Sequence, residues 1–271
     1  MDCFYINLDS AVQRKTRLED NFAAVRKADW NLIRFPAIDA VYVQNKNIGG
    51  KAKPAEKGCF LSHQILIGQQ LSDDKTFFIL EDDAVLGART CALIDKVLGR
   101  NKTLDWDILF TDVCITELVT MQELLKYRRD LASKKIEVAF LDLSKVIFGG
   151  STAYLVNGKS KQKVFDALQA ATEIDMPYDL YLRHLASRSS LKVFSLFPFV
   201  TSLSEFSDAS QIRDSNQATI VTVWNLYRKM VWIERDLDKS RAALENYKNM
   251  FCDDEMIAFG TLFSLMAAIR G

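Results

Sequence analysis

The segment 77–86 constrains the fold of this chain more than any other. Four apolar residues ending at Leu80 are followed directly by three acids, Glu81, Asp82 and Asp83. An apolar run without polar alternation is typical of a strand buried on both faces of an α/β sheet, and such sheets bind ligands at the carboxyl ends of their strands. Adjacent carboxylates repel one another unless positive charge lies nearby. The segment therefore predicts a site for Mn²⁺ or Mg²⁺, which prefer oxygen ligands; alone, it also fits a solvated turn or a helix start.

Composition and charge exclude several classes of protein. The 271 residues are 49% hydrophobic and 26% charged, which suits one large domain, or one domain with an appendage. Lys+Arg and Asp+Glu are both 35, so no basic field predicts nucleic-acid binding. The five cysteines are scattered, without the close pairs of zinc sites or disulfide frameworks, and we expect reduced thiols. The chain opens with a strand and lacks a leader in which a basic start is followed by an apolar segment. We therefore expect a cytoplasmic location.

Strand and helix patterns alternate along the first half of the chain, which predicts an α/β fold with a mostly parallel central sheet. The expected strands are 3–8, 32–38, one ending at 81, 106–111, 151–156 and 191–199, and the expected helices are 11–26, 57–71 and 159–171. From Thr219 onward the chain contains no proline and only two glycines, which predicts a helical pair. We therefore expect a catalytic domain over 1–215 and a C-terminal helical extension over 216–271.

Four segments together resemble glycosyltransferase family 25, which contains bacterial lipooligosaccharide galactosyltransferases and related domains that glycosylate collagen. They are YINLD at 5–9 followed by Arg14 and Arg17, FPAIDA at 35–40, EKGCFLSH at 56–63 and FILEDD at 78–83. The resemblance covers roughly residues 3 to 212. It implies a GT-A-like nucleotide-sugar-binding fold, a UDP-sugar donor, and inversion at the anomeric carbon. It further implies β-linked transfer of a hexose, with galactose from UDP-galactose as the first candidate, to a lipooligosaccharide, lipopolysaccharide or related surface glycan.

Asp83 is the predicted metal ligand. A sugar nucleotide leaves a diphosphate that gains negative charge, and a divalent cation bridging its phosphates stabilises that charge. Since side chains alternate along a strand, Glu81 and Asp83 face the same cleft. Glu81 would reach the ribose, while Asp82 turns aside or bridges through water.

Further donor contacts are predicted where the first strand turns into the first helix, because free N–H groups at a helix start attract anions. The candidates there are Asn7, Asp9, Arg14 and Arg17. Either arginine pairs with phosphate or is an exposed helix residue neutralised by Glu19 and Asp20. Asp39 follows the second strand and either contacts the ribose or base, or caps a helix or turn.

An inverting transfer needs a base that accepts the proton of the attacking hydroxyl. Asp179 is the first candidate because it follows Pro177 at a helix start and fits the family pattern. An acid there is also common simply because the helix dipole favours it. Asp112, after the strand 106–111, is the second candidate. The resemblance places His63 near the diphosphate or the acceptor, although a lone histidine in a helix is often a hydrogen-bonded structural residue.

The C-terminal region leaves two interpretations open. Basic residues gather in 126–135, and aromatic and basic residues mix in 224–232, which suits an anionic membrane surface and a lipid-linked saccharide acceptor. The protein would then lie peripherally on the inner face of the cytoplasmic membrane. The apolar stretch 256–269 is too short to span a bilayer. Packing against the catalytic domain or in a homodimer explains the region equally well, and the basic run also fits a solvated helix face. The alternative to an enzyme is a binding or scaffold protein on the same fold with a degenerate site.

Overall fold

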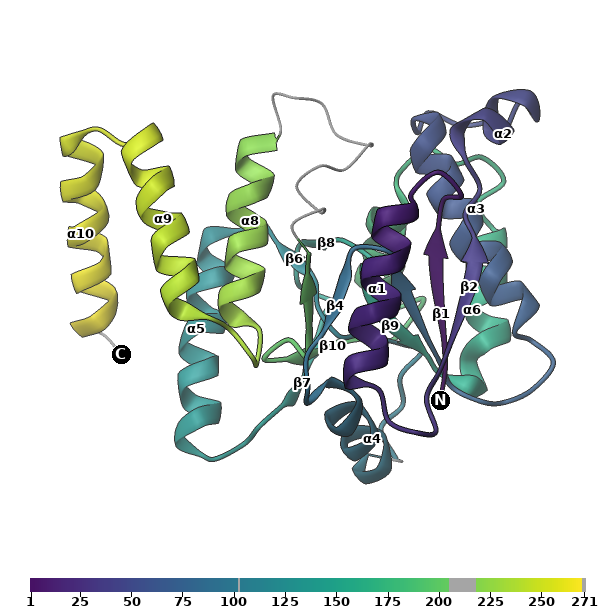
Figure 1. The fold of residues 1–271 in the computed structure, drawn as a ribbon, viewed down its shortest axis with the longest axis horizontal. Coiled ribbons are helices and arrows are strands. Elements are labelled where there is room, and N and C mark those ends of the chain that lie inside the picture. The colour runs from purple at the N-terminus through teal and green to yellow at the C-terminus, as the bar shows by residue number, and fades with distance from the viewer. Residues whose placement is uncertain (102, 205–217, 270–271) are drawn as a thin grey trace.

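The computed structural model describes residues 1–101, 103–204 and 218–269. Its centre is a seven-stranded sheet (Figure 1). In sheet order the strands are β2 (Asn31–Pro36), β1 (Asp2–Asn7), β3 (Phe77–Glu81), β9 (Ala153–Val156), β5 (Ile108–Phe110), β10 (Val193–Phe197) and β7 (Ala139–Asp142).

Five of the seven strands run in one direction. β1 pairs in parallel with β2 and β3, and β5 pairs in parallel with β10. β9 lies antiparallel between β3 and β5, and β7 is antiparallel at the edge. The mostly parallel sheet predicted from sequence is confirmed. Because β9 is reversed, its first residues meet the carboxyl ends of β1, β3 and β5 at the same edge.

Helices cover both faces of this sheet. They are α1 (Val12–Val25), α2 (Ala40–Asn45), α3 (Pro54–Gln69), α4 (Thr90–Arg100), α5 (Leu118–Ser133), α6 (Lys161–Gln169), which a short 3₁₀ turn (Gly158–Ser160) precedes, and α7 (Tyr178–Ser187). Two small ladders complete this part of the chain: β4 (Ala84–Leu86) with β11 (Thr201–Leu203), and β6 (Cys114–Ile115) with β8 (Phe148–Gly149).

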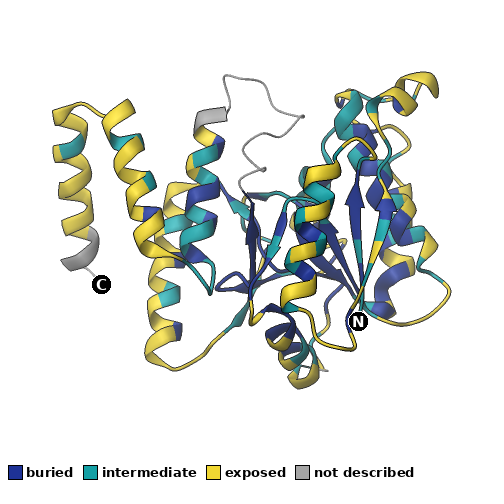
Figure 2. Cartoon of the chain, viewed as in Figure 1, coloured by how far each residue is buried: buried dark blue, intermediate teal, exposed yellow. Residues whose placement is uncertain are grey.

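The apolar run of β3 supplies both halves of the core. Ile79 packs with residues of α3, α6 and α7 on one face, whereas Phe78 and Leu80 pack with residues of α1 and α4 on the other. The strand is buried throughout its apolar part, and the burial of the central strands is plain in Figure 2. The predicted strand with two buried faces is therefore confirmed.

In the described range 218–269, three helices follow the sheet, one more than the predicted pair: α8 (Ala218–Val231), α9 (Leu237–Phe251) and α10 (Asp254–Ile269). α8 packs against β6 and β11, and α9 packs against α8. α10 lies at the outer end of the molecule and is largely exposed (Figures 1 and 2). The predicted domain boundary between 215 and 216 lies outside the described residues. Within the described ranges, no helix has both the length and the apolarity needed to cross a membrane.

Candidate active site

A cavity of about 390 Å³ opens at the carboxyl end of β3. Its polar wall includes Glu81 and Asp83 from the end of β3, Asp179 from the first turn of α7, and Arg228 from α8. The loop 149–152, which leads into the reversed strand β9, forms another side. Four elements that are far apart in sequence thus converge on the sheet edge that was predicted to hold the site.

Glu81 is held at the wall of this cavity by two partners. The Ser151 hydroxyl donates a hydrogen bond to Oε1 of Glu81, and Nε2 of His63 lies 3.6 Å from the same oxygen. Burial by itself raises the pKa of Glu81, but the His63 and Ser151 contacts outweigh it and the net direction is downward. Glu81 therefore enters the cavity as a carboxylate.

Asp83 has a different environment. Its Oδ1 is buried and has no hydrogen-bond partner among the described residues, and Nη2 of Arg14 is 3.7 Å from Oδ2. Burial, and then the negative charge of Glu81, raise the pKa of Asp83 to about 7. A divalent cation would supply both the missing partner of Oδ1 and the missing positive charge beside this buried carboxylate. The donor chemistry of Asp83 therefore fits Mn²⁺ or Mg²⁺.

Asp82 turns away from the cavity and joins the first strand and helix. Its Oδ2 accepts a 2.8 Å hydrogen bond from Nδ2 of Asn7, and its Oδ1 accepts a 2.7 Å bond from Nη1 of Arg14. Burial raises the pKa of Asp82, and the contacts with Arg14 and Asn7 offset this only in part. The structure thus brings three of the predicted donor residues into one network behind Asp83.

The other predicted donor residues lie outside the cavity wall. Asp9 is exposed and pairs with Arg34 at 2.6 Å. Arg17 is half-buried on α1. Asp39 caps α2, where its side chain accepts a 2.7 Å hydrogen bond from the Tyr42 backbone N–H. Asp39 therefore performs the capping role, one of the two roles predicted for it.

Asp179 faces the cavity from the start of α7. Its Oδ2 accepts a 2.6 Å hydrogen bond from the Gly150 backbone N–H. The approach is close, because a Cβ on Gly149 would lie 3.0 Å from the same oxygen. Burial raises the pKa of Asp179, and the backbone hydrogen bonds oppose the rise without cancelling it. A carboxylate with a raised pKa at the cavity wall is suited to accepting a proton.

Asp112 is fully buried and forms an ion pair with Nη2 of Arg228. Its Oδ1 accepts a 3.1 Å hydrogen bond from Thr201. Arg228 also donates a 3.1 Å bond to the hydroxyl of Thr152. Asp112 is thus placed behind the cavity, where it orients Arg228.

His63 is also fully buried and lies behind Glu81. Its Nδ1 shares a 2.8 Å hydrogen bond with the Tyr154 hydroxyl, which shares another of 2.8 Å with the Tyr178 hydroxyl. The imidazole stacks on the Tyr178 ring with centroids 4.1 Å apart. Cys59, His63 and Glu81 each bring one ligand atom to within 4.8 Å of the others. That set suits a softer ion such as Zn²⁺ better than Mn²⁺ or Mg²⁺.

The sequence predicts that the aromatic and basic mix around Arg228 either meets a membrane or packs against the catalytic domain, and for Arg228 the structure shows packing. The Arg228 side chain is only 3% exposed and lines the cavity. One signal was available: Val221, Asn225, Arg228 and Val231 recur at helical spacing and are all buried. A charged residue on the buried face of a helix indicates a partner within the fold.

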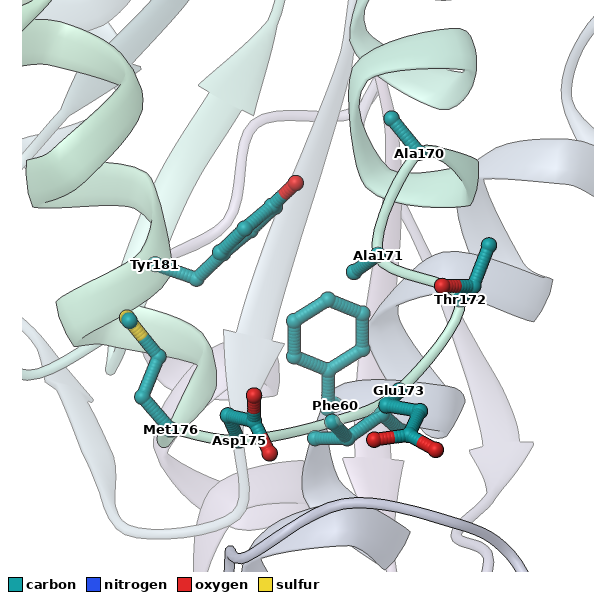
Figure 3. Close-up of a pocket in the computed structure, with 9 residues that line it drawn as sticks. Phe60, Ala170, Ala171, Thr172, Glu173, Asp175, Met176 and Tyr181 are labelled. Carbon is teal, nitrogen blue, oxygen red and sulfur yellow. The ribbon is translucent and has the colours of Figure 1, made fainter.

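A second cavity, also about 390 Å³, lies elsewhere (Figure 3). It is bounded by Phe60, Tyr181 and the segment 170–176 between α6 and α7. Its two acids are Glu173 and Asp175, and Asp175 accepts a 3.0 Å hydrogen bond from the Lys51 backbone N–H. This cavity contains none of the predicted site residues.

The chain is similar to a known protein family over most of its length. The family model described as glycosyltransferase family 25 (LPS biosynthesis protein) matches residues 1–182. The matched region contains the acidic end of β3 and Asp179, and it ends before α8. No curated protein matches the chain. Since the match covers 182 of 271 residues, the chain belongs to glycosyltransferase family 25.

Proposed function

We propose that the protein is an inverting, metal-dependent enzyme that moves galactose from UDP-galactose, in β linkage, onto a lipooligosaccharide or lipopolysaccharide. Family membership supports a glycosyltransferase of LPS biosynthesis with a nucleotide-sugar donor and a saccharide acceptor. The single observation that supports metal-dependent catalysis is the environment of Asp83, whose buried Oδ1 has no hydrogen-bond partner among the described residues. The mixed sheet with its reversed strand β9 supports a GT-A-like fold.

Asp83 would hold Mn²⁺ or Mg²⁺ with few other protein ligands, since both ions retain several waters. The bound ion would neutralise charge on the two donor phosphates. Glu81, kept ionised by Ser151 and His63, would accept hydrogen bonds from the ribose. Asn7, Arg14 and Asp82 would fix the first strand and helix against the nucleotide. Direct nucleotide contacts of Asp9, Arg17 and Asp39 remain part of the proposal, although all three lie outside the cavity wall.

Asp179 would act as the general base. The acceptor oxygen forms a bond to the anomeric carbon, the bond from that carbon to the diphosphate oxygen breaks, and the acceptor proton passes to Asp179. The cavity position and the raised pKa of Asp179 support this role. Asp112, the second candidate, is paired with Arg228 away from the wall, and His63 would position Glu81. Asp179 is therefore the better supported base.

A lipid-linked acceptor on the inner face of the cytoplasmic membrane is proposed because apolar side chains are exposed on α10. Met256, Phe259, Phe263 and Leu265 are each more than half exposed. The basic segment of α5 contributes less than predicted, because Arg128 donates a 3.1 Å hydrogen bond to the Trp232 carbonyl after α8. The same apolar surface would also serve a homodimer.

The proposal is tested by incubating the protein with Mn²⁺ and a panel of UDP-sugars, with and without a saccharide acceptor. We expect UDP release from UDP-galactose that stops when the metal is chelated, and a product whose anomeric proton has the β coupling constant. A folded protein that neither binds UDP nor turns over any UDP-sugar would instead support the scaffold alternative.

A further inference from the structure

Arg228 is a buried cation in the wall of an acidic cavity. Its Nη2 pairs with Asp112 and donates to Thr152, and its Nε is buried with no partner among the described residues. The cavity wall also contains Glu81, Asp83 and Asp179. A guanidinium keeps its charge even when buried, and here Asp112 and Thr152 fix its orientation. A cation oriented toward a ligand cavity is arranged to meet an anion.

The approach to this guanidinium is kept open by Gly150. Its φ is +79°, which favours glycine, and a Cβ at this position would lie 3.4 Å from Nη1 of Arg228. The same Cβ would lie 3.7 Å from Nη2, so a side chain at this position would contact the guanidinium. The Gly150 backbone N–H is bonded to Asp179, so the same residue lies between the proposed base and the cation.

We propose that Arg228 binds the phosphate of the nucleoside diphosphate from which the sugar departs. This inference rests on the proposed function and deepens it. When the bond from the anomeric carbon to the phosphate oxygen breaks, its electron pair remains on that oxygen, and a preorganised cation there stabilises the developing charge. The guanidinium fork matches phosphate geometry. Asp112 is then a positioning residue that holds Arg228 in place.

This role also gives α8 a function. Arg228 lies beyond the residues matched by the family model, which end at 182, and beyond the predicted catalytic domain. Val221 and Trp224 of the same helix line the cavity as well. The first C-terminal helix would therefore complete the active site, whereas α9 and α10 remain outside it.

The test uses the full chain, two variants of the proposed site and one control variant. Arg228→Gln combined with Asp112→Asn removes both charges and leaves no unpaired buried ion. Removal of Arg228 alone would leave Asp112 buried without a counter-charge. Arg228→Lys keeps the charge and loses the fork. Lys229→Gln, the same charge change one residue along α8 and outside the cavity, is the matched control. Thermal unfolding establishes that each variant is folded, and calorimetry then measures binding of UDP and of uridine.

We expect the double variant to bind UDP about 10- to 100-fold more weakly, the range for a lost hydrogen bond to a charged group, with uridine affinity unchanged. Turnover should fall further than UDP affinity, because the charge on the phosphate increases in the transition state. Arg228→Lys should fall between wild type and the double variant, and Lys229→Gln should match wild type.

Equal UDP affinity and turnover in wild type and a folded double variant would overturn this inference alone. If the double variant does not fold, Arg228→Lys decides the question, and wild-type UDP affinity and turnover in that variant would overturn it. Failure of the wild-type protein to bind UDP would overturn the proposed function, and this inference with it.

Discussion

The side-chain amide of Asn7 donates a 2.8 Å hydrogen bond to Oδ2 of Asp82, and so joins the carboxyl ends of β1 and β3. Arg14 binds the other oxygen of Asp82 at 2.7 Å. Both oxygens of Asp82 are thus occupied, whereas Oδ1 of the next residue, Asp83, has no hydrogen-bond partner among the described residues. Adjacent acids in one short motif therefore differ: Asp82 stabilises the edge of the sheet, and Asp83 is available to a ligand.

This difference predicts opposite results for two isosteric substitutions. Asp83→Asn should weaken Mn²⁺-dependent UDP binding at least 10-fold without lowering stability, because it removes a buried carboxylate that lacks sufficient counter-charge. Asp82→Asn should lower the free energy of unfolding by about 1–3 kcal/mol, since its amide NH₂ group would face a donor, on Asn7 or Arg14, where a carboxylate oxygen now accepts. Calorimetry with and without Mn²⁺, together with urea unfolding, measures both. Unchanged Mn²⁺-dependent UDP binding by Asp83→Asn would remove Asp83 from the metal site.

The proposed base gives a second prediction. Asp179→Asn should reduce transfer by at least about 100-fold, the usual contribution of a general base, while UDP affinity stays near that of the wild type. The amide oxygen of Asn can still accept the hydrogen bond from Gly150, so the loop 149–152 should keep its position. Steady-state transfer assays and calorimetry separate the two effects. Near-normal turnover would refute the assignment.

Asp179 should also make stability depend on pH. Burial raises its folded pKa above the ordinary value of 3.8. Between pH 3.8 and the raised folded pKa, the Asp179 carboxyl of the folded protein retains a proton that the unfolded chain has lost. Stability therefore falls as pH rises through this window. Above the window the full penalty persists. Asp179→Asn has no such penalty. Urea unfolding at pH 4 and pH 7 should show that Asn stabilises the protein more at pH 7, and an equal effect at both pH values would contradict the raised pKa.

The buried central strand β3 was predictable because it is an uninterrupted apolar run, and the mostly parallel sheet was predictable because strand and helix patterns alternate. The sequence did not reveal the direction of each strand. The residues of β9, AYLV, are apolar throughout and would suit either orientation, yet β9 is antiparallel to both neighbours. The β4–β11 and β6–β8 ladders were also missed, because strands of two or three residues are too short to show a period.

The site was predictable where local spacing determines geometry. Alternation along a strand places Glu81 and Asp83 at one cavity, although their roles remain predictions. The partner of Arg228 was not predictable, because Asp112 lies 116 residues earlier in the chain. The sequence also could not choose between the two predicted roles of Asp39, because an acid after a strand suits either a helix cap or a nucleotide contact. In the structure Asp39 caps α2.

The exposed apolar surface of α10 gives a prediction about what the protein binds. Phe259 and Phe263 are 51% and 60% exposed, and burying them against a membrane or a second copy would remove apolar area from water. Combined Phe259→Asp and Phe263→Asp should abolish vesicle binding or self-association, whichever the wild type shows. Leu118→Asp with Val119→Asp, at apolar sites on α5 that are at least as exposed, is the control.

Flotation with anionic vesicles and sedimentation at several protein concentrations distinguish the two partners. Salt-sensitive flotation would indicate the membrane, and a mass that rises with concentration would indicate a dimer. A wild-type protein that stays monomeric and does not bind vesicles would contradict both interpretations of α10.

Gly58 gives a prediction about the packing that positions α3. A Cβ at Gly58 would lie 2.4 Å from the Ile38 carbonyl oxygen, a backbone atom that cannot rotate away. Gly58→Ala should therefore push α3 away from the start of α2 and lower the free energy of unfolding by about 1–3 kcal/mol. Gly99, in α4, has no atom within 4 Å of the same position, so Gly99→Ala should stabilise the protein by about 0.5–1 kcal/mol through helix propensity. Urea unfolding measures both, and effects of the same sign would contradict the close contact between α3 and Ile38.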